Sequence, residues 1–122
     1  MFHERLEAIL AAIGERATVA LVSSDGLLVE AAHHPHRGGP ALDLDMLAAE
    51  LVALAQSISE NHREFGGDGV HGLSLVTERL NVSLAPIDDG FFLLAATSSE
   101  ASLGRVRYEL RKAPLQLAGA LS

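Results

Sequence analysis

The pattern of hydrophobic and polar positions is clearest at residues 91–96, Phe-Phe-Leu-Leu-Ala-Ala, which follow a polar Asp-Asp-Gly turn sequence. Six apolar residues with such abrupt ends favour a strand over a helix. Because successive side chains of a strand point to opposite faces, a run without alternation predicts burial on both faces. We therefore expect a central strand with helices on either side of its sheet. Thr97 and Glu100 follow at the spacing of a capping box, which predicts that a helix begins there.

Three segments show the 3.6-residue spacing of amphipathic helices. Residues 2–13 form the first, with Gly14 at its expected end, and a long helix is expected from Asp43, its N-cap, to about Glu64. The core-facing stripe predicted for the long helix is Leu44, Leu47, Ala48, Leu51, Leu54, Ala55 and Ile58. The last helix carries Leu103, Val106, Leu110, Ala113 and Leu117 at core spacing.

The remaining hydrophobic segments are typical of strands. Residues 18–22 and 27–29 flank Ser-Ser-Asp-Gly, and an Asp-Gly pair between two β-type runs predicts a hairpin. Residues 73–77 and 81–85 predict two more strands, with Pro86 at a strand end because proline cannot donate to a sheet ladder. The proline- and glycine-rich stretch 33–42 predicts a loop. The expected order is α-β-β-α-β-β-β-α, an α+β fold in a single domain over residues 1–122.

The long helix also has an informative face opposite its core stripe. Met46, Ala49 and Ala53 fall together there, with polar residues around them: Glu50, Gln56, Ser57 and Glu60. Small side chains on an outward face allow another backbone to approach closely. Alanine is equally at home on a solvated helix face, because it is the best helix former. The pattern alone supports either interpretation.

Composition excludes several classes of protein. The chain has 122 residues and a net charge of −7, which argues against nucleic acid or anionic membrane as the main partner. It has no cysteine, so disulfides, thiol nucleophiles and sulfur-ligated zinc are absent. The N-terminus does not resemble a signal peptide, and no apolar stretch approaches the roughly 20 residues that span a bilayer. We expect a soluble cytoplasmic protein.

No motif predicts an enzyme, a metal site or a cofactor. Residues 67–72 match G-x-G-x-x-G, but a helix precedes and a strand follows, the reverse of a dinucleotide-binding unit. His33, His34 and His36 lie in the predicted loop without regular ligand spacing, so a solvated loop is the favoured interpretation. No serine lies in a nucleophile motif, and the acidic residues are scattered.

Four of the nine basic residues cluster late in the last helix, at Arg105, Arg107, Arg111 and Lys112. Cations near a helix C-terminus complement the helix dipole, so a solvated face is one interpretation. Recognition of an acidic partner is the other.

The order and spacing of four segments resemble the Roadblock / dynein light chain 7 domain family over nearly the whole chain. These segments are Val-Ser-Ser-Asp-Gly-Leu-Leu-Val at 22–29, the alanine-rich helix 43–64, the loop Phe-Gly-Gly-Asp-Gly-Val at 65–70 and residues 93–107. The glycine loop is similar to that of bacterial members encoded beside small GTPases. Among these, regulators of the mutual-gliding protein B type bind a Ras-like GTPase and accelerate its GTP hydrolysis by ordering the GTPase's own catalytic machinery.

The resemblance implies a five-stranded antiparallel sheet with the first and last helices on one face and the middle helix on the other. It also implies a homodimer in which the middle helices pair and the third strands continue one sheet across two chains. The interface residues expected on this basis are Met46, Ala49, Glu50, Ala53, Gln56, Ser57, Glu60, Leu73, Leu75 and Thr77.

The favoured hypothesis is therefore a non-enzymatic homodimeric adaptor that binds and regulates a small Ras-like GTPase. An assembly scaffold without effect on hydrolysis is the alternative. A third possibility, a small-ligand sensor or enzyme, requires a deep polar-lined cavity between sheet and helix.

Overall fold

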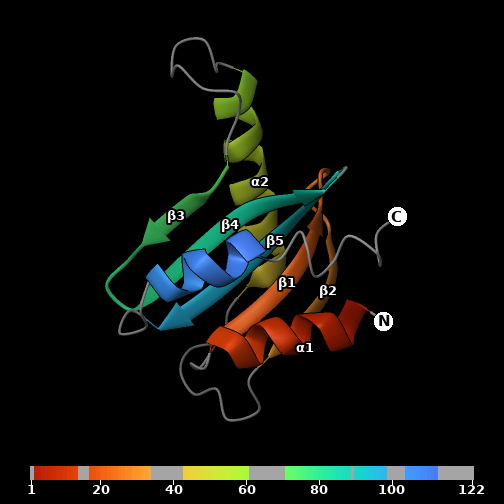
Figure 1. Cartoon of the computed structure of the whole chain (residues 1–122). Helices are drawn as coiled ribbons and strands as arrows, with labels where there is room; N and C mark the ends of the chain where they lie inside the picture. Colours follow the sequence, from red (N-terminus) through yellow and green to blue (C-terminus); the bar gives the residue numbers. More distant parts are fainter. Residues whose placement is uncertain are drawn as a thin grey trace.

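The computed structural model describes residues 2–13, 17–33, 43–60, 71–88, 90–98 and 104–112. The labelled elements are α1 (Phe2–Ile13), β1 (Ala17–Ser23), β2 (Leu28–His33), α2 (Leu44–Glu60), β3 (Leu73–Val76), β4 (Leu80–Asp88) and β5 (Phe91–Ser98). A last helix follows at 104–112 (Figure 1). The five strands form one antiparallel sheet in the order β2-β1-β5-β4-β3. The predicted order of elements and the fold class are confirmed.

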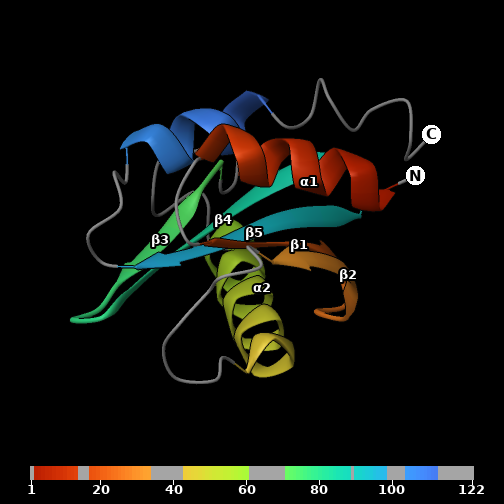
Figure 2. The ribbon, with the colours of Figure 1, turned by 90° about the horizontal axis from the view of Figure 1, so that it is seen from below.

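The sheet lies between two helical layers. Seen along the sheet, α1 and the helix at 104–112 lie on one face and α2 lies on the other (Figure 2). This is the arrangement that the family resemblance implied. Among the described residues, no helix is both long and apolar enough to cross a bilayer.

β5 is the central strand, as its unbroken apolar run predicted. It pairs with β1 on one side and β4 on the other. Leu93 and Ala95 belong to the hydrophobic cluster under α1, whereas Leu94 and Ala96 belong to the cluster under α2. All four are buried, so each face of this strand contributes to a different core.

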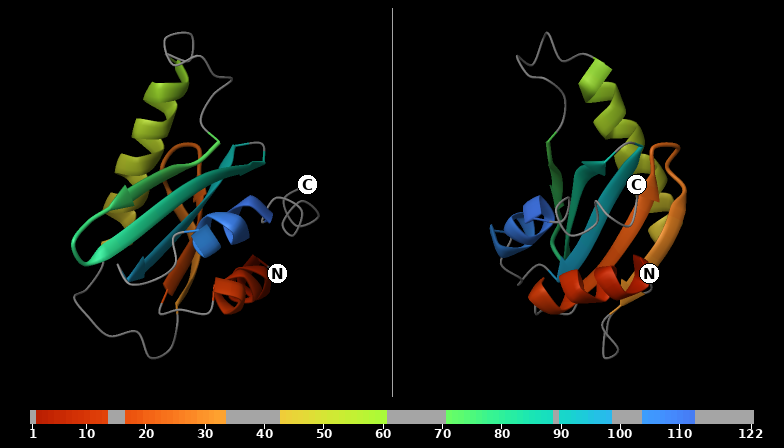
Figure 3. Two further views of the ribbon diagram at one scale, coloured as in Figure 1. Left: turned by 60° about the vertical axis from the view of Figure 1, so that its left-hand side comes forward. Right: turned by 45° about the vertical axis from the view of Figure 1, so that its right-hand side comes forward.

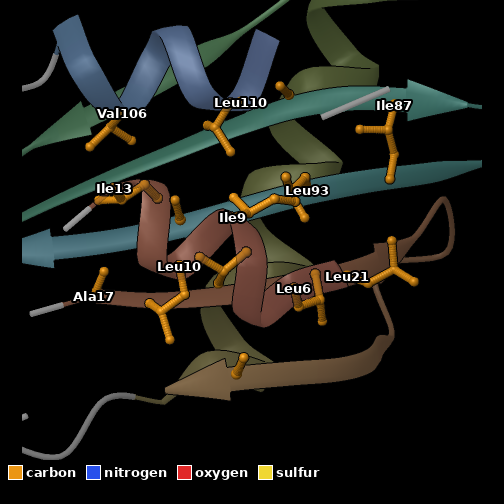
Figure 4. Close-up of a cluster of buried hydrophobic side chains, with 14 residues drawn as sticks. Leu6, Ile9, Leu10, Ile13, Ala17, Leu21, Ile87, Leu93, Val106 and Leu110 are labelled. Carbon is orange, nitrogen blue, oxygen red and sulfur yellow. The ribbon is translucent and has the colours of Figure 1, made fainter. Parts of the chain in front are cut away.

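The core on the α1 side joins that helix to the sheet through a compact set of aliphatic side chains (Figure 4). Leu6, Ile9 and Ile13 are buried and point at strands β1 and β5, and Val106 and Leu110 of the last helix extend the same cluster. Each fully buried Leu or Ile contributes roughly 1.5–3 kcal/mol relative to exposure.

Two expectations for the helices differ from the structure. Leu54 was expected in the core stripe of α2 but is 48% exposed, whereas Val52, which was not expected there, is 1% exposed. The core stripe is therefore rotated toward Val52, because α2 packs across the sheet at an angle that periodicity does not specify. Thr97 is not a helix N-cap: it lies in β5, and the next residue is still strand.

Smaller differences concern strand ends. His33 was assigned to a loop but ends β2, where its Nδ1 lies 3.0 Å from the Thr18 Oγ1 across the hairpin. Pro86 does not end β4, which continues to Asp88. It lies beyond the part of β4 that pairs with β3 and next to a register shift against β5, where the ladder is already irregular.

Some predictions fall outside the described residues. These are the helix ends at Gly14 and Glu64, the loop at 34–42 with His34 and His36, and all but the end of the glycine motif at 67–72. Glu100 and the last-helix positions Leu103, Ala113 and Leu117 are outside them as well. The predicted N-cap of α2 is confirmed, because an Asp43 carboxylate oxygen accepts a hydrogen bond from the Met46 backbone N–H at 3.0 Å.

Candidate interaction surface

Strand β3 is the outermost strand on its side of the sheet. It pairs only with β4 among the described residues, and none of them forms a ladder with the backbone donors and acceptors of its other edge. Figure 3 shows it at the outer edge of the sheet, with α2 on the face opposite α1 and the last helix. A short edge strand with its second side open is suited to pairing with another chain.

Side chains of β3 alternate between the two faces of the sheet. Leu73 packs against the cluster under α2, so Leu75, two residues on, points to the same face and is 44% exposed. Ser74 points to the other face, where its hydroxyl contacts Arg107 of the last helix. The α2 face therefore carries the exposed apolar side chain of this edge strand.

Helix α2 buries one side and exposes the rest. Ala48, Leu51, Val52 and Ala55 are buried against the sheet. All seven α2 positions of the predicted interface are exposed: Met46, Ala49, Glu50, Ala53, Gln56, Ser57 and Glu60. In or just after β3, Leu75 and Thr77 are exposed and Leu73 is half-buried.

The exposed side of α2 is not uniform, because one flank contacts the β1–β2 hairpin of the same chain. Gln56 Nε2 donates a hydrogen bond to the Ser24 carbonyl oxygen at 2.6 Å. A Cβ placed on Gly26 would lie 3.1 Å from the Ala49 Cα, and Gly26 has φ of 81°. Ala49 and Gln56 thus already have neighbours within the chain, which sequence reasoning missed because the contact joins residues far apart in the sequence.

The opposite flank of α2 is apolar and has no such cover among the described residues. Leu47, Leu54 and Ile58 share it at helical spacing, and Leu54 is 48% exposed while the other two are half-buried. Met46, 51% exposed, lies nearby on the outward side. We call the set Met46, Leu47, Leu54, Ile58, Leu73 and Leu75 the α2–β3 surface.

The charge on α2 is entirely negative. Leu44–Glu60 contains Asp45, Glu50 and Glu60 and no basic residue. A partner that covers the α2–β3 surface must therefore place these carboxylates at the rim, in water, rather than bury them unpaired.

The described residues contain no group of three or more His, Asp or Glu side chains placed to hold a metal ion. They include a surface cleft of about 600 Å³ between β3–β4 and the last helix, on the face away from α2. Under α1 and under α2, the packed clusters already described lie between helix and sheet.

Comparison with known proteins gives one family. A model of the Roadblock/LC7 domain matches residues 9–97, most of the chain. No curated protein sequence matches the chain significantly.

The chain is also similar to several solved structures. The gliding protein MglB from Thermus thermophilus is 22% identical with a TM-score of 0.81, over 95% of this chain and 84% of that one. Myxococcus xanthus MglB is 16% identical with a TM-score of 0.79, over 98% and 93% of the two chains. Profilin II from Acanthamoeba castellanii is 13% identical with a TM-score of 0.60, over the full length of both. At these identities the likeness establishes the fold alone.

Proposed function

Because this chain belongs to the Roadblock/LC7 domain family, we propose that it is a homodimeric adaptor that binds and regulates a small Ras-like GTPase. The observation that supports the dimer most directly is the α2–β3 surface: an open strand edge beside exposed Leu54 and Leu75 on one face of the sheet. Isolated exposed leucines are ordinary, but a group of them next to an unpaired edge is typical of an interface.

Two copies of the chain related by a two-fold axis can cover the α2–β3 surface of each other. Antiparallel pairing of β3 with the partner's β3 gives both edges hydrogen-bond partners and continues the sheet across two chains. The same axis brings the two α2 helices together on one face, so that Leu54 and Leu75 are covered. The exposed Ala53 leaves room for such an approach, and Glu50 and Glu60 stay at the solvated rim.

The proposal that the partner is a GTPase rests on the resemblance of this chain to bacterial relatives of the mutual-gliding protein B type. The two solved MglB structures share the fold, and one of them is described as a gliding protein. In the dimer, the paired α2 helices provide a broad surface that neither chain has alone. A GTPase bound there needs no catalytic residue from this chain if binding orders its own catalytic machinery.

The test is a titration of the purified protein against a small Ras-like GTPase encoded next to it, loaded with GDP or with a non-hydrolysable GTP analogue. We expect binding in one nucleotide state to be at least about tenfold tighter than in the other, which corresponds to about 1.4 kcal/mol. Absence of binding in both states would contradict the proposal.

Single-turnover GTP hydrolysis, with and without the protein, then separates two roles. A regulator changes the hydrolysis rate, whereas an assembly scaffold binds and leaves the rate unchanged. The monomeric Leu54→Glu/Leu75→Glu variant described in the Discussion is the control, because a dimer platform predicts that it loses both effects.

A further inference from the structure

The cleft on the face away from α2 has a distinctive lining. It lies between β3–β4 and the helix at 104–112 and measures about 600 Å³, a size typical of pockets for small molecules or peptide side chains. Arg107, Arg111 and His71 supply its polar and basic groups, together with Ser74 and Ser83. Leu110, Ala85 and Pro86 form its apolar wall. Leu73 and Leu84 also border the cleft, but their side chains belong to the cluster on the α2 face.

The two arginines are held over the cleft by the fold. Arg107 and Arg111 are four residues apart, so they lie on the same face of their helix. The Nε of Arg107 donates to the Ser74 Oγ at 3.4 Å, and that hydroxyl lies 3.1 Å from the Ser83 Oγ on β4. Leu110, between them in sequence, is 3% exposed and fixes the helix on the sheet. The guanidinium of Arg107 is therefore oriented by contacts that leave further N–H donors for a ligand.

The cleft is positive in a chain that is strongly negative overall. The whole sequence has 16 acidic and 9 basic residues, yet none of the described residues that line the cleft is acidic. The one acidic residue of the helix at 104–112, Glu109, is nearly buried and forms an ion pair with Lys112 at 3.3 Å. Among the described carboxylates, none pairs with Arg107 or Arg111. Within the described part of the chain, their charges are therefore available to an incoming anion.

We propose that this cleft binds a short acidic segment of a partner protein, with carboxylates on the arginines and apolar side chains against Leu110, Ala85 and Pro86. Guanidinium groups bind carboxylates through paired, charge-assisted hydrogen bonds, which accounts for the anionic half of the ligand. A single small anion would occupy only the arginine end and leave the apolar wall uncovered. A membrane surface is a poor fit, because the arginines line a concavity in a chain of net charge −7.

The arginines of this site lie on the face of the sheet away from α2, because helix 104–112 and α2 are on opposite faces (Figure 2). Strand β3 borders both the cleft and the α2–β3 surface. The cleft therefore offers the adaptor a second point of attachment. If the cleft does not bind an acidic peptide, the GTPase proposal is unaffected. If the protein does not bind a GTPase, the proposal for the cleft is unaffected.

The experiment uses a short fluorescein-labelled peptide in which glutamate alternates with leucine, and a matched peptide with glutamine in place of glutamate. By fluorescence polarisation, the whole protein should bind the acidic peptide at least about tenfold more tightly than the glutamine peptide. Added salt should weaken only the binding of the acidic peptide. In NMR spectra of the unmodified protein, the acidic peptide should shift the amide signals of Ser74, Ser83 and the 104–112 helix.

The variant Arg107→Gln/Arg111→Gln should lose the preference for the acidic peptide. The matched control is Arg79→Gln/Arg105→Gln, which removes the same charge from positions that do not line the cleft and should keep the preference. Equal loss in both variants, equal binding of both peptides, or NMR shifts confined to the α2 face would overturn the proposal. Complete displacement by millimolar inorganic phosphate, or tighter binding to anionic phosphatidylserine vesicles than to the peptide, would overturn it in favour of a small anion or a membrane.

Discussion

The two faces of the sheet have equivalent interiors but different exteriors. Leu93 on the α1 side and Leu94 on the α2 side are both fully buried, in separate clusters of similar aliphatic composition. Outside these cores, α2 presents acidic residues and exposed leucine, whereas the helix at 104–112 presents arginines and a cleft. The interiors account for the fold, and the difference between the exteriors suggests two partners of different chemistry.

The interiors can be compared by truncating one central side chain on each face. Leu93→Ala and Leu94→Ala should each lower the free energy of unfolding by about 2–5 kcal/mol, because each leaves a cavity in a packed cluster. Urea denaturation at one fixed protein concentration measures both, since a dimer's stability depends on concentration. A loss several-fold larger on one side would show that the two cores are not equivalent.

The α2 exterior can be tested by placing charge on it. Leu54→Glu/Leu75→Glu should raise the dimer dissociation constant about a hundredfold or more, since four glutamates would then face one another across the two-fold axis. Sedimentation velocity would show monomers at concentrations where the unmodified chain is a dimer.

The matched control for this variant is Leu27→Glu, at another strongly exposed leucine, in the hairpin turn away from the α2–β3 surface. It should leave the dimer unchanged. Ala53→Glu is a better single substitution than Ala49→Glu, because Ala49 also contacts the hairpin within the chain. An unchanged mass for the double variant would contradict the pairing.

The attachment of α2 to the hairpin can be measured at two glycines with the same backbone angle. Gly26 and Gly90 both have φ of 81°, but a Cβ on Gly26 meets the α2 backbone at 3.1 Å, whereas the nearest described atom to one on Gly90 is the Ser24 hydroxyl at 3.6 Å. Gly26→Ala should therefore cost about 2–3 kcal/mol of stability, and Gly90→Ala about 1 kcal/mol. Equal losses would mean that backbone angle alone sets the cost.

The smallest effect concerns Gln56, which joins α2 to the hairpin through one exposed hydrogen bond. Gln56→Ala should lower stability by about 0.5–1.5 kcal/mol, because the Ser24 carbonyl can recover a water partner. Glu50→Ala, at an exposed position of the same helix, is the control and should stay within about 0.5 kcal/mol of the unmodified chain. Thermal unfolding of the two variants side by side is sufficient to separate them.

Sequence reasoning succeeded where short-range pattern was enough. The unbroken apolar run at 91–96 identified the central strand, and the Asp25-Gly26 pair identified the first hairpin. It failed at Leu54 and Val52, because a helical stripe of mixed Leu, Val and Ala is compatible with several rotations of the helix. It also assigned Thr97 to a helix start, although pairing with β1 and β4 extends the strand through that residue.

The candidate interface was predicted more coarsely than the fold. All of the α2 residues proposed for it are exposed, but Ala49 and Gln56 also contact the chain's own hairpin. The apolar flank at Leu54 was missed because those positions were assigned to the core.

The sequence by itself determined the identity and order of the elements and the two-sided burial of β5, since these depend on periodicity and turn chemistry within a few residues. Only the tertiary structure decided which flank of α2 stays exposed, and that Arg107 reaches Ser74, 33 residues away, to line a cleft. The physical reason is that packing between segments distant in the sequence sets how a helix is rotated on the sheet. It also sets which side chains of helix and sheet come into contact. Local pattern restricts that packing but leaves several arrangements of similar hydrophobic burial.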